Sequence, residues 1–99
     1  MLVHSVYFWL KSGITLNERK LFFEEIESLR NIPSVRKSYC GTPAKTSPRE
    51  VIDRSYDCGL TVIFEDIAGH DAYQIDPIHK NFIEKCSPLW DKVKIYDAV

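Results

Sequence analysis

The sequence predicts one α+β domain with a ferredoxin-like fold, in which four strands form an antiparallel sheet and the helices cover one of its faces. Segments with an apolar residue at every second position alternate with segments that carry apolar residues at helical spacing, in the order β, α, β, β, α, β. Both helical segments begin with capping residues. The first and third strands carry large apolar groups on both sides, which indicates that both faces of the sheet are covered.

The strands are predicted where aromatic and β-branched residues recur at period two. In the first strand, His4 and Phe8 face one way, whereas Tyr7 and Trp9 face the other. In the third strand, Gly59 indicates either a bulge or a close approach of another group to the backbone. The four predicted strands are Met1–Lys11, Val35–Cys40, Tyr56–Phe64 and Lys92–Tyr96.

The first helix is predicted from a capping box and an apolar face. Thr15 and Glu18 have the spacing at which a hydroxyl and a carboxylate satisfy free amide groups of the first helical turn. The helix is expected to run to about Arg30, because Asn31 and Pro33 then stop it. Its predicted apolar face consists of Phe22, Phe23, Ile26 and Leu29.

The second helical region is predicted to be broken in the middle. Asp66 is a good N-cap for a helix that begins at Ile67. That helix must end before Pro77, since proline disfavours helical geometry in the residue ahead of it. Asp76 then caps a second helix, which has Pro77 as its first residue and runs to about Cys86.

Polar residues, glycine and proline mark the connections. The stretch Thr42–Asp53 is polar and contains two prolines, so we expect a mobile loop there. Ser87–Trp90 is expected to form a turn. No internal repeat is visible, and residues 1–99 are too few for two separate cores, so the chain is predicted to be one domain.

Composition excludes several classes of function. The formal net charge of -1 gives no basic field to hold nucleic acid. No apolar run approaches the ~20 residues of a membrane span, and Met1–Lys11 lacks the features of a signal peptide. The three cysteines form no CxxC pair and are interpreted as reduced thiols, mostly buried. We therefore predict a cytoplasmic protein that binds neither nucleic acid nor a membrane.

The helix-free face of the sheet predicts a partner. Alternate positions on both sides of the first and third strands are apolar, so this face would expose a large patch in an isolated chain. The simplest cover is a second copy of the chain packed face to face. We therefore predict a homodimer through the sheet face, with eight strands arranged as a barrel.

Two segments carry a resemblance to a known family. Tyr73–Phe82 reads Tyr-Gln-Ile-Asp-Pro-Ile-His-Lys-Asn-Phe, and Val93–Asp97 reads Val-Lys-Ile-Tyr-Asp. The first strand, from His4 to Lys11, also fits. A tyrosine, a helix break, Pro-x-His, an aromatic residue and a closing strand that ends in aspartate resemble the stress-responsive A/B barrel (Dabb) family. The resemblance spans nearly the whole chain and implies a dimeric α+β barrel.

The resemblance also implies a set of site residues. In the family's plant polyketide cyclase, the matching tyrosine and histidine perform an aldol-type ring closure, which implies His79 as general base and Tyr73 as orienting donor. His4 matches a third polar position of that pocket. The fourth, a histidine in the cyclase, falls at Cys58, so this chain departs from the cyclase there. The predicted pocket between sheet and helices is lined by Phe8, Phe23, Ile26, Leu60, Tyr73 and His79.

No metal or cofactor is expected from the spacing of the ligating residues. His4, His70 and His79 do not converge in sequence as metal ligands usually do. We expect His70 to be exposed on its helix beside Asp71. The sequence contains neither a glycine-rich phosphate loop nor a nucleophile elbow.

Three functions stay open at this point. The first is binding of a small apolar or carbonyl-containing molecule beside Tyr73 and His79. Its catalytic form is a cyclase-like enzyme in which His79 acts as general base. The second is a non-catalytic dimeric module for stress tolerance or assembly, in which His79 supports the helix break and Tyr73 is a core aromatic. The third, a haem-degrading monooxygenase on a similar barrel, lacks a recognisable haem ligand.

Overall fold

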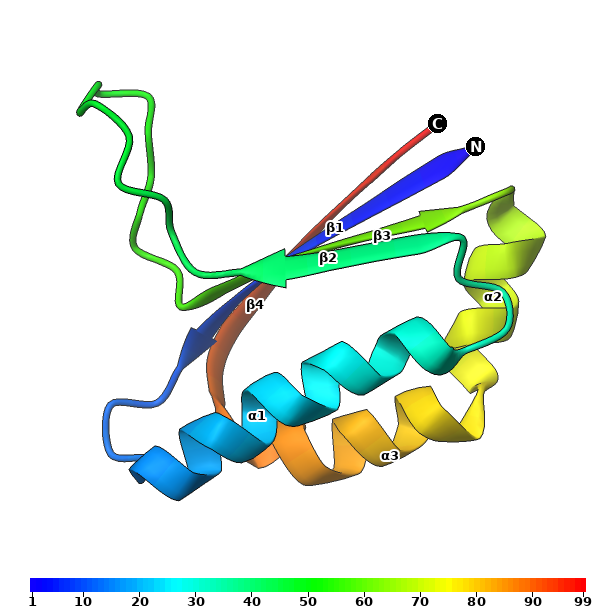
Figure 1. Ribbon diagram of the computed structural model, residues 1–99, viewed down its shortest axis with the longest axis horizontal. Helices are drawn as coiled ribbons and strands as arrows, with labels where there is room; N and C mark the ends of the chain where they lie inside the picture. Colours follow the sequence, from blue (N-terminus) through cyan, green and yellow to red (C-terminus); the bar gives the residue numbers. More distant parts are fainter.

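In the computed structural model, which describes residues 1–99, a four-stranded antiparallel sheet carries all helices on one face (Figure 1). This arrangement confirms the predicted fold class and the order of its elements. The strands are β1 (Leu2–Leu10), β2 (Lys37–Gly41), β3 (Cys58–Phe64) and β4 (Trp90–Ala98). The helices are α1 (Leu16–Ser28), α2 (Ile67–Ile75) and α3 (Pro77–Cys86), with short 3₁₀ turns at Leu29–Asn31 and Ser87–Leu89.

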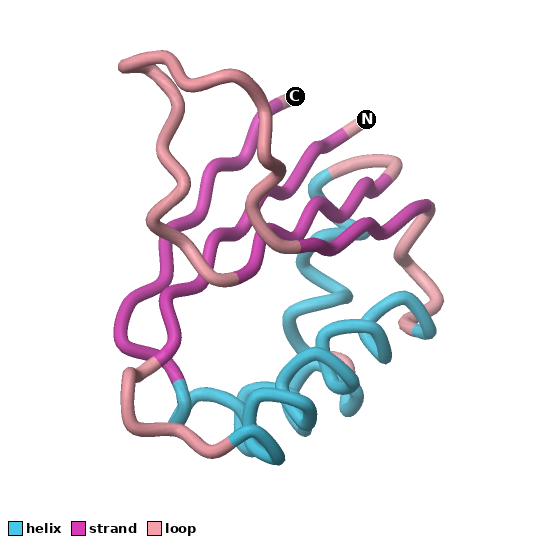
Figure 2. Tube along the Cα trace, turned by 60° about the vertical axis from the view of Figure 1, so that its left-hand side comes forward, coloured by secondary structure: helices cyan, strands magenta, loops and turns pink.

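The strand order is β2-β3-β1-β4, so β1 lies in the interior of the sheet and pairs with both β3 and β4. In this register His4 lies opposite Val62 of β3 and Asp97 of β4. Residues directly opposite each other share a face of the sheet. The long connection between β2 and β3 projects beyond the sheet, away from the helices (Figure 2).

The core lies between the sheet and the helices. Every second residue of β1 is buried, from Leu2 to Leu10, and β3 follows the same pattern from Cys58 to Phe64. Phe22 and Ile26 of α1 are fully buried against this face. Burial of an aliphatic or aromatic side chain contributes about 1.5–3 kcal/mol, so this face supplies most of the stability.

The opposite, helix-free face is aromatic and only partly covered. Tyr7 and Trp9 of β1 are half-buried there. Gly59 lies opposite Tyr7 in regular register, and a Cβ at this position would lie 3.3 Å from the Tyr7 ring and 3.4 Å from the Tyr56 ring. Gly59 therefore allows a close approach of two aromatic rings, which is the second of the two predicted roles, and not a bulge.

The strand ends differ from those predicted. The second strand begins at Lys37 and not at Val35, and the third begins at Cys58 and not at Tyr56. Before Cys58, the backbone N–H of Asp57 donates to the carbonyl oxygen of Phe8, and the Asp57 carboxylate accepts from Leu10 N–H, both at 2.8 Å. These contacts with β1 fix the entry to β3. The fourth strand is longer than predicted, because it pairs with almost the whole of β1.

Capping confirms the predicted starts of the helices, whereas α1 ends at Ser28 and not near Arg30, because a 3₁₀ turn takes over at Leu29. The Thr15 hydroxyl accepts from Glu18 N–H while the Glu18 carboxylate accepts from Thr15 N–H, as the capping box requires. Asp66 accepts from Gly69 N–H at 2.9 Å and starts α2. Asp76 ends α2 and starts α3, since its N–H donates to Tyr73 and its carboxylate accepts from Ile78 N–H.

Replacing Asp66 with alanine should weaken the start of α2. The substitution leaves Gly69 N–H without its partner, so we expect the free energy of unfolding to fall by about 0.5–2 kcal/mol. Urea unfolding followed by circular dichroism measures this loss. Glu84→Ala, at an exposed position of α3, is the matched control and should change stability by no more than about 0.5 kcal/mol. Equal stability of Asp66→Ala and the control would contradict the capping role.

Candidate functional site

A cluster of histidine and tyrosine rings lies between the sheet and the helices α2 and α3. The ring centroids of Tyr73 and His79 are 4.6 Å apart, and those of His4 and Tyr73 are 5.9 Å apart. The Phe64 ring packs against the Tyr73 ring with 5.0 Å between the centroids and covers one side of the cluster. The structure thus brings together His4, Tyr73 and His79, the three polar residues that the sequence predicted, from β1, α2 and α3.

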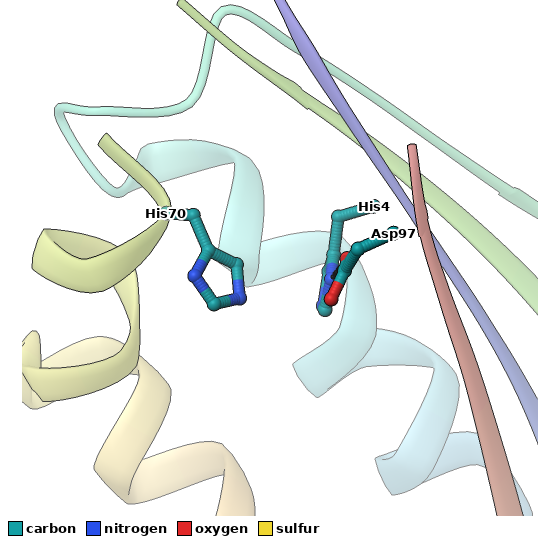
Figure 3. Close-up of side chains that lie close together, drawn as sticks. All are labelled: His4, His70 and Asp97. Carbon is teal, nitrogen blue, oxygen red and sulfur yellow. Dashed lines mark hydrogen bonds and ion pairs between the residues drawn. The ribbon is translucent and has the colours of Figure 1, made fainter. Parts of the chain in front are cut away.

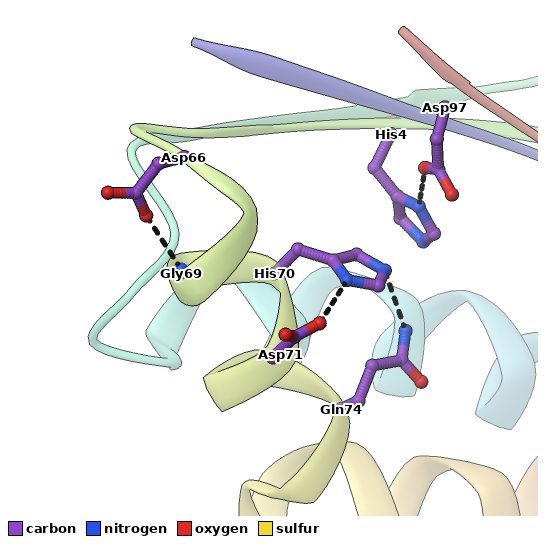
Figure 4. Close-up of polar contacts among 7 residues, drawn as sticks. All are labelled: His4, Asp66, Gly69, His70, Asp71, Gln74 and Asp97. Atoms are coloured by element: carbon purple, nitrogen blue, oxygen red, sulfur yellow. Dashed lines mark hydrogen bonds and ion pairs between the residues drawn. The ribbon is translucent and has the colours of Figure 1, made fainter. Parts of the chain in front are cut away.

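His4 is paired with a carboxylate. Its Nδ1 lies 2.5 Å from Oδ1 of Asp97, because the β1–β4 register places the two residues opposite each other on the same face (Figure 4). A carboxylate only accepts, so Nδ1 of His4 carries a proton and donates it to Asp97. The His4 side chain is 4% exposed and that of Asp97 is 42% exposed, so the pair connects the buried cluster to solvent.

The sequence predicted an exposed His70, but the structure places this residue partly inside the cluster. Its side chain is 21% exposed, and its ring lies 5.1 Å from that of His4. His70 precedes Tyr73 by three residues, and this spacing places both on one face of α2 toward the sheet. The predicted neighbour Asp71 does contact His70, with 3.1 Å between the carboxylate and Nδ1.

Burial shifts the pKa values of Tyr73 and His79 in opposite directions. Tyr73 is 1% exposed, and this burial raises the pKa of its phenol, which therefore stays protonated. Burial lowers the pKa of His79, and the nearby His4 and His70 lower it further. Hydrogen bonding with the Gln74 backbone and the charge of Asp76 oppose that effect. At neutral pH the pair is a phenol donor beside an uncharged imidazole.

The other predicted pocket residues lie in or beside the core. Phe8, Ile26 and Leu60 are buried, and Phe23 is half-buried against Phe22. Cys58 is also buried, which raises the pKa of its thiol to about 12. It lies four residues along β3 from Val62, the residue opposite His4. That is about 13 Å at the usual rise of a strand, so the structure does not bring Cys58 to the ring cluster. Its assigned place as a pocket residue stays a prediction.

Two polar members of the cluster were missed from the sequence. In the sequence Asp97 only ends the closing strand, because its pairing with His4 depends on strand register. The spacing of the three histidines in the sequence does not indicate that His70 lies beside His4. The three-residue spacing between His70 and Tyr73 was the one signal that placed them on a common helix face.

Fold and cluster together define a ferredoxin-like α+β protein with a buried tyrosine beside a half-buried histidine beneath the sheet. Residues 2–99 match the model of the stress responsive A/B barrel domain (Dabb), and the chain belongs to this family. The match includes Tyr73–Phe82 and Val93–Asp97 and confirms the resemblance that these segments predict. No helix has the length and apolar character needed to cross a membrane.

Solved structures share the fold over nearly the whole chain. A Dabb family protein with a ferredoxin-like fold from Mesorhizobium loti is 26% identical, with a TM-score of 0.79 over 99% of this chain and 94% of its own. A dimeric ferredoxin-like protein from Thermobifida fusca is 16% identical, with a TM-score of 0.81 over 99% and 89% of the two chains. A hydroxynitrile lyase from Passiflora edulis is 20% identical, with a TM-score of 0.79 over 98% and 90%. No curated protein sequence matches the chain.

The lowered pKa of His79 predicts a pH-dependent stability. Below about pH 6.5 the unfolded chain takes up a proton at this residue more readily than the folded chain does. The stability associated with neutral His79 is therefore complete above about pH 6.5 and is lost as the pH falls toward the lower pKa of the folded state. We expect His79→Gln to flatten the decline in unfolding free energy between about pH 7.5 and 5.

Urea unfolding at several pH values measures this difference. Lys80→Gln, which removes an exposed charge from the neighbouring position of α3, is the control and should keep the slope of the wild type. Parallel pH profiles of wild type and His79→Gln would show that His79 does not contribute.

Proposed function

We propose that this chain binds a small apolar or carbonyl-containing molecule beside Tyr73 and His79. The observation that carries the proposal is the pairing of a protonated phenol with an uncharged imidazole, 4.6 Å between ring centroids, in a largely buried setting. His4 lies 5.9 Å from Tyr73 and adds a third polar group. A carbonyl oxygen would accept from the Tyr73 hydroxyl, and His79 would face the adjoining carbon.

The same pair supports an enzymatic form of the proposal. His79 would remove a proton from the carbon next to a carbonyl group, while Tyr73 donates a hydrogen bond to the resulting enolate oxygen. The enolate carbon would form a bond to a second carbonyl carbon, and the proton held by His79 would pass to the new alkoxide. This is the aldol-type step of a cyclase-like enzyme. The fold of the Passiflora edulis hydroxynitrile lyase supports small-molecule chemistry on such a scaffold.

A specific observation favours the alternative of a non-catalytic module. Phe8, Ile26 and Leu60, which were expected to line the pocket, belong to the continuous core and pack against other side chains. Phe8 contacts the rings of Phe22 and Trp90 at 5.3 and 5.2 Å. A ligand would therefore occupy the polar end of the layer near His4 and not the middle of the core.

The helix-free face supports a homodimer as the working form of the protein. Tyr39 and Tyr96 are 61% and 58% exposed on this face, and Val3 and Ile63 are only half-buried. A hollow of about 360 Å³ on this face is lined by Tyr7, Trp9, Asp53, Tyr56, Lys92, Lys94 and Tyr96. Its aromatic walls suit side chains of a second copy. The dimeric Thermobifida fusca protein has the same fold and supports this assembly.

The proposed location is the cytoplasm. Cys40, Cys58 and Cys86 are all unpaired, and unpaired thiols are typical of a reducing compartment. The small net charge of -1 supports the proposal that nucleic acid is not a partner.

A thermal-shift screen with aromatic, polyketide-like and short-chain carbonyl compounds tests ligand binding. A compound at a hundredfold excess over its dissociation constant should stabilise the native protein by about 2.7 kcal/mol. His79→Ala should abolish the shift, and Tyr73→Phe should reduce it because the ring remains while the hydroxyl is lost. Lys80→Ala is the control and should behave as wild type. A compound that shifts wild type and His79→Ala equally binds elsewhere, and a panel without any shift would favour the non-catalytic module.

Ile63→Glu should disrupt the proposed dimer. The new carboxylate would lie opposite Lys37 within the sheet, so the fold should tolerate it, but it would place a charge in the apolar interface. Sedimentation should give about twice the chain mass of 11.5 kDa for wild type and a single chain mass for the variant. Ile75→Glu, at a position that is 69% exposed on α2, should remain dimeric. A wild type that sediments as a monomer would overturn the proposed assembly.

A further inference from the structure

Three potential metal ligands converge beside the ring cluster, at the end of the sheet where β1 begins and β4 ends. A nitrogen of His4, a nitrogen of His70 and a carboxylate oxygen of Asp97 all lie within 4.8 Å of one another. They come from β1, α2 and β4, and the His70 ring projects across the gap toward the other two side chains (Figure 3). Residues from three separate elements thus meet at one point.

The two imidazoles have the spacing of a pair bound to one ion. Their ring centroids are 5.1 Å apart, with the planes inclined at 62°. Two imidazoles on a tetrahedral ion with metal–nitrogen bonds of ~2.0–2.1 Å place their centroids about 5 Å apart. Donor atoms in such a site lie about 3.3 Å from one another, so the most distant pair must close by up to about 1.5 Å. Rotation of the partly exposed His70 and Asp97 side chains can supply this movement. His4 would bind through Nδ1, so its proton would move to Nε2 and the 2.5 Å contact with Asp97 would widen to admit the ion.

Hydrogen bonds already orient the donor atom of His70. Asp71 accepts from Nδ1 at 3.1 Å, and the Gln74 amide nitrogen lies 3.4 Å from Nε2 (Figure 4). Nδ1 therefore carries the proton, and Nε2 is an acceptor whose lone pair is held by an amide donor. A carboxylate on the far nitrogen is the usual outer partner of a metal-binding histidine. Displacement of the exposed Gln74 amide would expose the lone pair to an ion.

We propose that His4, His70 and Asp97 form a binding site for a divalent transition-metal ion of the zinc type. Two neutral imidazoles and one carboxylate are a donor set that suits Zn²⁺, and sites with three protein ligands keep a fourth position for water or a ligand. Exposure of Asp97 gives an ion access from solvent, whereas the low exposure of His4 excludes bulk water from the inner side. This site lies on the helix face of the sheet and shares His4 with the proposed small-molecule pocket, but its affinity for an ion can be measured without any small-molecule ligand.

Zinc binding to protein stripped with a chelator tests the proposal. Isothermal titration should give one Zn²⁺ per chain in the wild type. His70→Ala removes a ligand from a partly exposed helix position and should weaken binding by at least about 100-fold, beyond the 10–100-fold typical for loss of an outer partner. Asp97→Asn, which keeps the shape of the side chain, should also weaken binding, so one test remains if the other variant folds poorly. Melting temperatures in chelator verify that both variants are folded.

Two controls separate this site from other sources of binding. His79→Ala removes a nearby imidazole that is outside the three-ligand set, and it should retain zinc affinity even if it loses the small-molecule response. The visible spectrum of bound Co²⁺ should have the bands of nitrogen and oxygen ligands and lack a sulfur charge-transfer band, which excludes the three free cysteines. Absence of zinc binding by the wild type, undiminished binding by both His70→Ala and Asp97→Asn, or a thiolate spectrum would each overturn the proposal.

Discussion

The structure depends on the register in which β1 pairs with β3 on one side and with β4 on the other. Side chains alternate between the two faces of a strand, so a slip of one residue would turn His4 and Phe8 to the helix-free face and bring Tyr7 and Trp9 into the core. The core and the ring cluster are therefore specified by the same pairing. A strand that is central to the sheet and buried on one face tolerates no other alignment.

Residues near one another in sequence made most of the fold predictable. The caps at Thr15, Asp66 and Asp76 act over two or three residues, and each was predicted at the position where the structure has it. The strand ends were less predictable, because contacts with β1 decide where β3 begins and how far β4 extends. The pairing of His4 with Asp97 spans 93 residues and follows only from strand register, which no local pattern specifies. Helical spacing places His70 on the same face as Tyr73, but its approach to Asp97 also follows only from strand register.

One physical cause gives the candidate site its chemical character. Removal from water disfavours the charged form of any group, so burial keeps the acid Tyr73 protonated and the base His79 free of its proton. Burial is the largest cause for both residues, and for His79 the nearby His4 and His70 add to it. The carboxylate of Asp97 lies at the solvent side of this layer and contacts His4, while Phe64 packs against the Tyr73 ring.

Because Asp76 is the C-cap of α2 and the N-cap of α3, the directions of the side chains on one helix do not determine those on the other. Each residue of an α-helix advances the side-chain direction by about 100°, but the extended backbone of Asp76 interrupts that progression, and α3 starts again at Pro77. If one residue were inserted into or deleted from α2, the side chains that precede the change would rotate by about 100° around the helix axis relative to Asp76. His79 follows the cap in α3, so its side chain would keep its orientation. A change of length in α2 would therefore alter the residue that this helix presents to His79 without altering α3.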